Sequence, residues 1–167
     1  FVMDFWTDRI VAEYTGRPQF ANDLYEKVRL LSLFYNMKGL FENNLKGIFS
    51  YFSYKNCTHL LADTPDYLKD KQLITSIGIG NKSKGVRATT PIIKYGFRLI
   101  RDWLLKPVTR IEKDHEGNEI EVTVPNLYNI RCRALIKELI QWNVYGNFDR
   151  VMALVQLMLY REEKMIL

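Results

Sequence analysis

The stretch "GNFDRVMALVQLMLY", residues 146–160, predicts a helix that is apolar over almost its whole surface. A helix of that kind is stable in water only when other elements cover it on several sides, so we expect it deep in the fold. Asp149 opens this helix. A carboxylate there either caps the free N–H groups of the first helical turn or binds a cation.

The rest of the chain predicts an α/β fold built on a mixed sheet with helices on its faces. "FVMDFW" (1–6) and "RIVAEYTG" (9–16) predict two antiparallel strands joined by a tight turn, and "KGLFEN" (38–43) predicts a short strand after a crossover helix over 20–35. The sheet should be antiparallel at one edge and parallel beyond that helix. Further helices are expected near 44–56, 91–105, 127–142 and 149–163, with an inserted β-hairpin over 108–124. With no linker or repeat visible, residues 1–167 are predicted to form a single domain.

Composition excludes several classes of protein. Hydrophobic residues make up 47% and charged residues 26%, as in soluble globular proteins. No apolar run approaches the roughly 18 residues that cross a bilayer. Cys57 and Cys132 lie far apart without a CxxC pattern, which favours reduced thiols in a cytosolic protein over disulfides or zinc. The chain starts without Met and inside a predicted strand, so we expect it to be part of a longer protein.

Charge is unevenly distributed along the chain. Residues 69–106 hold nine Lys and Arg against two Asp, a net of +7, whereas residues 112–121 hold five acids against one Lys, a net of −4. A basic face beside an acidic projection favours a polyanionic partner, with nucleic acid first among the candidates. The alternative is a solvated surface with no partner.

Glu42 in "LFENNLKG" (40–47) lies at the carboxyl end of the predicted strand 38–43, where ligand sites of α/β sheets form. Either it interacts with the start of the next helix, or it binds a metal. Together, Glu42 and Asp149 would suit Mg²⁺ or Mn²⁺. Two such ions about 3.5–4 Å apart can activate water and stabilise the leaving oxygen in phosphodiester cleavage.

The loop "GNKSKGVRATT" (80–90) is rich in glycine and cations. Lys82, Lys84 and Arg87 are candidates to bind a phosphate backbone, and the alternative is an ordinary surface loop. The loop lacks the GKS or GKT ending of a nucleotide-binding loop, so ATP hydrolysis is not expected of this domain.

Five segments in order carry a family resemblance: "VAEYTGRP", "LFENNLKG", "LLADTP", "KGVRATTP" and "NFDRVMALVQLML". Together they resemble the C-terminal nuclease domain of the large terminase subunit, the DNA-packaging motor of tailed phages and prophages. The resemblance implies a ribonuclease H-like fold and an endonuclease that cuts concatemeric viral DNA with two Mg²⁺ or Mn²⁺ ions. It also implies double-stranded DNA, the portal and the small terminase subunit as partners, and the cytoplasm of the bacterial host as the location.

In that family three acids hold the metals, and the resemblance assigns the second to Glu42 and the third to Asp149. The first is expected upstream, on a strand that precedes this sequence, as is the ATPase domain of the family. If 1–6 were instead the first strand, Asp4 would be the third carboxylate. Two other functions stay open: a catalytically silent module that grips DNA and docks a motor partner through the acidic hairpin 108–124, and another ribonuclease H-like nuclease of resolvase or transposase type.

Overall fold

A computed structural model describes residues 1–44, 47–74, 83–143 and 145–166. The described chain is a mixed α/β structure of six α-helices and two small antiparallel sheets. In order, the elements are β1 (Val2–Asp4), β2 (Arg9–Ala12), α1 (Ala21–Phe34), α2 (Gly47–Tyr54), the 3-10 helix η1 (Thr58–Leu60), α3 (Tyr67–Asp70), α4 (Thr90–Leu105), β3 (Pro107–Lys113), β4 (Glu119–Pro125), the 3-10 helix η2 (Asn126–Asn129), α5 (Arg133–Gln141) and α6 (Asp149–Ile166).

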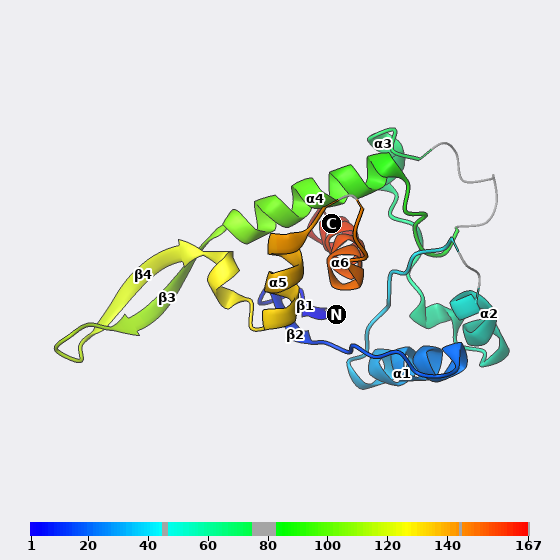
Figure 1. Ribbon diagram of the computed structural model, residues 1–167, viewed down its shortest axis with the longest axis horizontal. Coiled ribbons are helices and arrows are strands. Elements are labelled where there is room, and N and C mark those ends of the chain that lie inside the picture. The colour runs from blue at the N-terminus through cyan, green and yellow to red at the C-terminus, as the bar shows by residue number, and fades with distance from the viewer. Residues whose placement is uncertain (45–46, 75–82, 144, 167) are drawn as a thin grey trace.

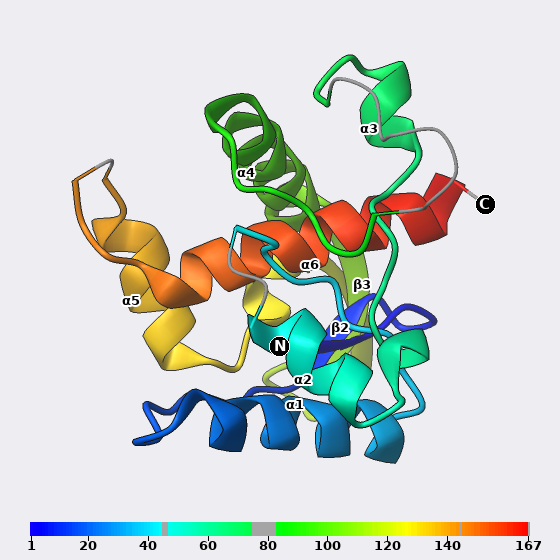
Figure 2. The ribbon, with the colours of Figure 1, turned by 90° about the vertical axis from the view of Figure 1, so that its right-hand side faces the viewer.

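Helix α6 lies at the centre of the fold, as its apolar sequence predicts (Figure 1). Its buried apolar residues are Val151, Leu154, Val155, Met158 and Leu159. Helix α4 crosses it closely, because Gly96 leaves room for Val155: a Cβ added at Gly96 would lie 2.5 Å from Val155 Cγ1. Figure 2 shows α5 beside α6, and α1 and α2 below α6.

Strands β1 and β2 form the predicted antiparallel hairpin, with Met3 opposite Ile10 and Asp4 opposite Arg9. The turn between them contains Asp8 at a φ of 58°. The Asp8 carboxylate accepts hydrogen bonds from Arg161 Nη2 at 2.7 Å and Lys106 Nζ at 2.9 Å, so the turn is tied to α6 and to the end of α4.

The predicted continuous mixed sheet is present only in pieces among the described residues. β1 pairs with β2 alone, while the extended segment 39–43 makes single parallel bridges, Gly39 with Leu61 and Glu42 with Val86. The sequence predicts both antiparallel and parallel pairing, and both occur. No described strand, however, connects the β1–β2 pair to the parallel bridges of residues 39–43. The α/β class is confirmed.

The β3–β4 hairpin is confirmed and is slightly longer than predicted. Its seven residue pairs run from Pro107 opposite Pro125 to Lys113 opposite Glu119. Figure 1 shows it extending away from the helices to one side of the molecule. Of its larger apolar side chains, Ile111 and Ile120 are exposed.

The helix predicted over 127–142 is wrong in its first part. Residues 126–129 form the short 3-10 helix η2, and α5 begins only at Arg133. The buried Asn126 donates a hydrogen bond from its side chain to the Trp103 carbonyl at 3.2 Å, which anchors the chain to α4 before α5 starts. Cys57 and Cys132 are free thiols, as expected. None of the described helices is both long and apolar enough to cross a membrane.

Candidate metal-binding site

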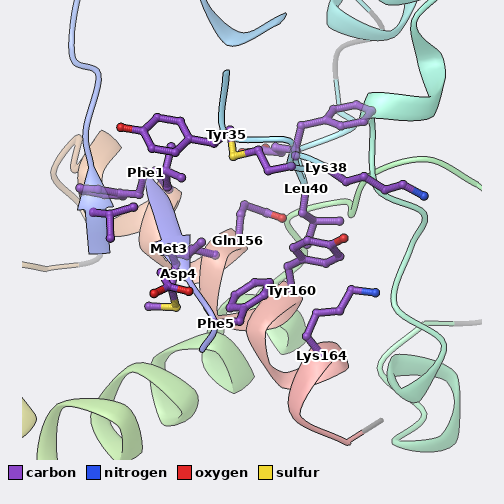
Figure 3. A pocket seen from close by; sticks show the side chains of 18 of the residues that line it. Phe1, Met3, Asp4, Phe5, Tyr35, Lys38, Leu40, Gln156, Tyr160 and Lys164 are labelled. Atoms are coloured by element: carbon purple, nitrogen blue, oxygen red, sulfur yellow. The ribbon is translucent and has the colours of Figure 1, made fainter. Parts of the chain in front are cut away.

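A pocket of about 950 Å³ lies over one face of α6, between β1 and the extended segment that follows α1. Its walls are residues 1–5 on one side and residues 35–42 on the other (Figure 3). Asp4, Glu42 and Asp149 all line it. The fold therefore brings both sequence-predicted metal ligands, and the alternative third acid, to one pocket.

Glu42 is held at the end of the segment 39–43 by backbone pairing with residue 86. Val86 donates its N–H to the Phe41 carbonyl at 2.9 Å, and Asn43 donates its N–H to the Val86 carbonyl at 3.1 Å. The Glu42 side chain is exposed and accepts a hydrogen bond from the Asn44 amide. Helix α2 begins at Gly47, so Glu42 is not the residue directly before this helix.

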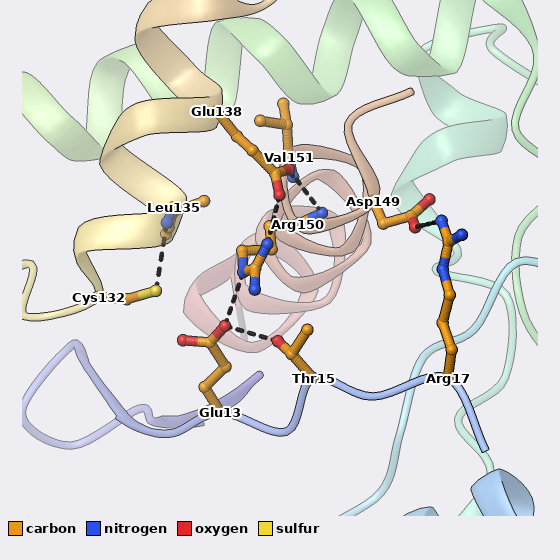
Figure 4. Close-up of polar contacts among 9 residues, drawn as sticks. All are labelled: Glu13, Thr15, Arg17, Cys132, Leu135, Glu138, Asp149, Arg150 and Val151. Atoms are coloured by element: carbon orange, nitrogen blue, oxygen red, sulfur yellow. Dashed lines mark hydrogen bonds and ion pairs between the residues drawn. The ribbon is translucent and has the colours of Figure 1, made fainter. Parts of the chain in front are cut away.

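Asp149 is the first residue of α6, as predicted. Its Oδ2 lies 3.6 Å from Arg17 Nη2, and both side chains are largely exposed, at 74% and 84% (Figure 4). An exposed ion pair of this kind contributes between about 0 and 1 kcal/mol. The carboxylate is therefore available to another cation at little cost.

Glu138 on α5 fixes the position of Asp149 by capping the first turn of α6. It accepts hydrogen bonds from the Arg150 backbone N–H at 2.9 Å and from Arg150 Nη1 at 2.6 Å (Figure 4). Arg150 also donates from Nε to Glu13 at 2.9 Å. The hydrogen bond that Arg150 donates to Glu138, followed by the one that it donates to Glu13, raises the pKa of Arg150. This network satisfies helix-start N–H groups that the Asp149 side chain would otherwise have to cap.

Asp4 is engaged in the β1–β2 turn. Its carboxylate accepts hydrogen bonds from the Thr7 hydroxyl at 2.7 Å and from the Trp6 N–H at 3.0 Å. These two bonds, that from Thr7 first, lower the pKa of Asp4 below its ordinary value. The structure thus gives Asp4 a clear role in the turn, besides its place in the pocket wall.

The acids that line the pocket, Asp4, Glu42 and Asp149, offer carboxylate oxygens, which suit Mg²⁺ or Mn²⁺. Within the described ranges, no three acidic, histidine or cysteine side chains lie close enough together to hold one ion. Mg²⁺ needs no such cluster, because it commonly binds through one or two carboxylates, several waters and substrate phosphates. Glu42 and Asp149 fit that mode of binding.

The three candidate DNA-binding residues differ in what the structure says of them. Lys82 lies outside the described residues. Lys84 is half-buried and donates from Nζ to Asp63 Oδ1 at 2.9 Å and to the Leu61 carbonyl at 2.8 Å. Arg87 is exposed. Of the two that the structure describes, Arg87 is the one whose charge faces solvent.

Sequence reasoning missed two kinds of residue in this pocket. Lys38 and Lys164 are exposed cations that line it, Lys164 lying 5.3 Å from the centre of the Tyr160 ring. Gln156, on the buried face of α6, is 7% exposed, and neither its amide nitrogen nor its amide oxygen has a hydrogen-bond partner among the described residues. The sequence feature that could have singled out Gln156 is its position as the one polar residue in the apolar run "ALVQLML" (153–159).

In comparisons with known proteins, no family model, curated protein or solved structure matches this chain.

Proposed function

We propose that the protein is a metal-dependent DNA endonuclease of the kind found as the C-terminal domain of large terminase subunits. One observation carries the proposal. Glu42 and Asp149, singled out from the sequence as metal ligands although they lie far apart in the chain, line the same pocket. One acid on a wall of the pocket and another at the start of α6, which lines the same pocket, offer the carboxylate oxygens that hard cations bind.

Glu42 and Asp149 would hold the Mg²⁺ or Mn²⁺ ions, which when bound supply an activated water and neutralise the leaving oxygen of a phosphodiester. The protein contributes the placement of these two acids. The backbone pairing of residues 41–43 with Val86 fixes Glu42, and the Glu138 cap fixes the start of α6 and therefore Asp149. Arg17, which pairs weakly with Asp149, would be freed for a phosphate when a cation takes its place.

The substrate we propose is double-stranded DNA, as the concatemer that is cut during packaging of a viral genome. Arg87, Lys38 and Lys164 are exposed cations suited to contact the phosphate backbone. Contacts of this kind position DNA without reading its sequence. The portal and the small terminase subunit would be partners of the full-length protein in the cytoplasm of the bacterial host.

Nicking of supercoiled plasmid tests this function. The protein should nick plasmid in Mn²⁺ and stop when EDTA removes the metal. Glu42→Ala and Asp149→Ala should each lower the rate at least about 100-fold, because removing a group that stabilises the transition-state charge costs about 10²–10³ in rate. Asp23→Ala, an exposed acid on α1 outside the pocket, is the matched control. Unchanged nicking by both pocket variants would reject the proposal.

A second candidate is a catalytically silent module that grips DNA and docks a motor partner. The observation that favours it is the hairpin, which extends from the helices and includes all five acidic residues of the stretch 112–121 (Figure 1). DNA binding that weakens steeply with salt, without cleavage in Mn²⁺, would favour this candidate over the nuclease.

A further inference from the structure

A second hollow, of about 280 Å³, lies between α4 and α6. None of the described residues that line it also lines the pocket of Glu42 and Asp149. Its charged lining residues are the four cations Lys71, Arg98, Lys106 and Arg161 and the two acids Asp102 and Glu162. Four positive and two negative charges leave this lining with a net charge of +2. Pockets for drug-sized ligands begin near about 300 Å³, so the hollow suits a compact anion such as a phosphate group.

Two of the four cations are bound to Asp8, in the turn between β1 and β2. The Asp8 carboxylate lies 2.7 Å from Arg161 Nη2 and 2.9 Å from Lys106 Nζ. These contacts place the β1–β2 turn beside the hollow. Because two cations share one carboxylate, Asp8 compensates only part of their positive charge.

The other two cations, Lys71 and Arg98, are exposed. Arg98 Nε lies 3.8 Å from Asp102 Oδ2, and the same carboxylate has a closer partner in Arg101 Nη2, at 2.9 Å. Lys71 Nζ lies over the Tyr95 ring, 5.5 Å from its centre, a contact that uses the charge of the ammonium but none of its three N–H donors. An incoming anion would displace such exposed contacts at little cost.

Trp6 lies in the same β1–β2 turn, two residues before Asp8, and is 96% exposed. Since Asp8 ties this turn to Lys106 and Arg161, the indole lies near the positively charged hollow. Cations that contact phosphates, combined with an aromatic ring that stacks on a base, are the means by which proteins bind unpaired nucleotides. This part of the surface offers both.

We propose that the hollow between α4 and α6 binds a phosphate group of an unpaired nucleic-acid strand, and that Trp6 stacks on a base of the same strand. Lys71 and Arg98 contact the phosphate, and the two cations bound to Asp8 add to the positive potential. Bases within a duplex are stacked on one another and leave no free face for an indole, so the site prefers single strands. The inference goes beyond the nuclease proposal, because the site lies outside the metal-binding pocket and needs no metal.

Fluorescence anisotropy in EDTA, with a labelled single strand of about 12 nucleotides, tests the phosphate contact. Lys71→Gln combined with Arg98→Gln should weaken binding about tenfold. It should also reduce the slope of the logarithm of the binding constant against that of the salt concentration by about 1.4, because each lost contact removes about 0.7. Arg133→Gln combined with Lys137→Gln removes the same charge from exposed positions of α5 and should leave the affinity nearly unchanged.

The same measurement tests the stacking contact. Trp6→Ala should weaken binding of the single strand at least about fivefold, because base–aromatic stacking is lost. Binding of a duplex of the same sequence should hardly change. Trp6→Phe keeps an aromatic ring and should retain most of the affinity for the single strand.

Three results would overturn the inference. Equal affinity of the Lys71→Gln, Arg98→Gln variant and its α5 control would mean that the hollow holds no phosphate of the strand. Equal effects of Trp6→Ala on single strand and duplex would mean that Trp6 does not stack on an unpaired base. Inorganic phosphate bound at the hollow without any binding of the strand would mean that the site serves a free anion. Each is measured without metal, so it is distinct from failure of the nuclease proposal, which plasmid nicking tests.

Discussion

At the scale of single residues, Asp8 is the clearest example of a side chain whose neighbours set its chemistry. Its side chain is 14% exposed and holds Arg161 and Lys106 together. Burial alone would raise the pKa of Asp8, but hydrogen bonds from Arg161 and Lys106 outweigh it, and the pKa lies below its ordinary value. This carboxylate therefore favours folding most strongly when it is ionised.

Replacing Asp8 with Asn should destabilise the protein by about 2–3 kcal/mol at pH 7, because two cations lose their counter-charge. Asn tolerates the positive φ of this turn, so the change isolates the charge. Urea unfolding at pH 7 and at pH 3 measures the effect. Asp70→Asn, an exposed acid on α3, is the control.

The sign of the pH dependence follows from the lowered pKa. The stabilisation by Asp8 is complete above the unfolded pKa of about 3.9 and is lost as pH falls through the lower folded value. The difference between wild type and Asp8→Asn should therefore shrink as pH falls below about 4. A difference of equal size at pH 7 and pH 3 would contradict this account.

The two metal-binding candidates were predictable from the sequence, and their surroundings were not. Glu42 and Asp149 stand out because a strand end and a helix start are local patterns. Both line one pocket, and their role as metal ligands stays a prediction. The pairing of Lys84 with Asp63 and the capping of α6 by Glu138 depend on contacts between segments distant in the chain. No local pattern encodes such contacts.

At the scale of elements, the contact between α4 and α6 holds the core together. A Cβ at Gly96 would meet the buried, stiff side chain of Val155. The helices α1, α4 and α6 and the β3–β4 hairpin follow the sequence prediction closely, because their apolar spacing is regular over many residues. The start of α5 differs from the prediction, because residues 126–129 form η2, where Asn126 donates a hydrogen bond to the Trp103 carbonyl of α4.

Gly96→Ala should destabilise the protein by about 1–2 kcal/mol, because overpacking a filled contact costs more than the roughly 1 kcal/mol that Ala gains over Gly in a helix. The melting temperature should fall by about 2–8 °C. Lys94→Ala, an exposed position on the same helix, is the matched control. A higher melting temperature for Gly96→Ala would show that the two helices are less tightly packed than described.

At the scale of the whole molecule, the structure has a helical core around α6 and a smaller cluster of buried hydrophobic residues beside α1 and α2. The β3–β4 hairpin extends away from both. The smaller cluster is built on Phe52, Cys57, Leu60 and Leu61. The class of fold followed from the order of predicted elements. Whether the strands form one continuous sheet could not be predicted in the same way. The pairing of short strands depends on which strand edges meet, and the sequence of residues 39–43 does not indicate its partner.

Shortening the hairpin should leave the core intact. Joining Ile111 to Glu121, which lie opposite each other, through an Asn-Gly turn removes the tip and most of its acidic residues. We expect the free energy of unfolding to change by less than about 0.5 kcal/mol, because the removed strands pair with each other. Urea unfolding measures this. Loss of cooperative unfolding would mean that the tip is part of the core.

The central claim is that Glu42 and Asp149 hold divalent cations in one pocket. Titration of Mn²⁺ into the protein, followed by electron paramagnetic resonance of the free ion, measures binding without requiring activity. Glu42→Gln and Asp149→Asn should each weaken binding about tenfold or more, with Asp23→Asn unchanged. Mn²⁺ bound equally well by the wild type and both pocket variants would contradict the claim.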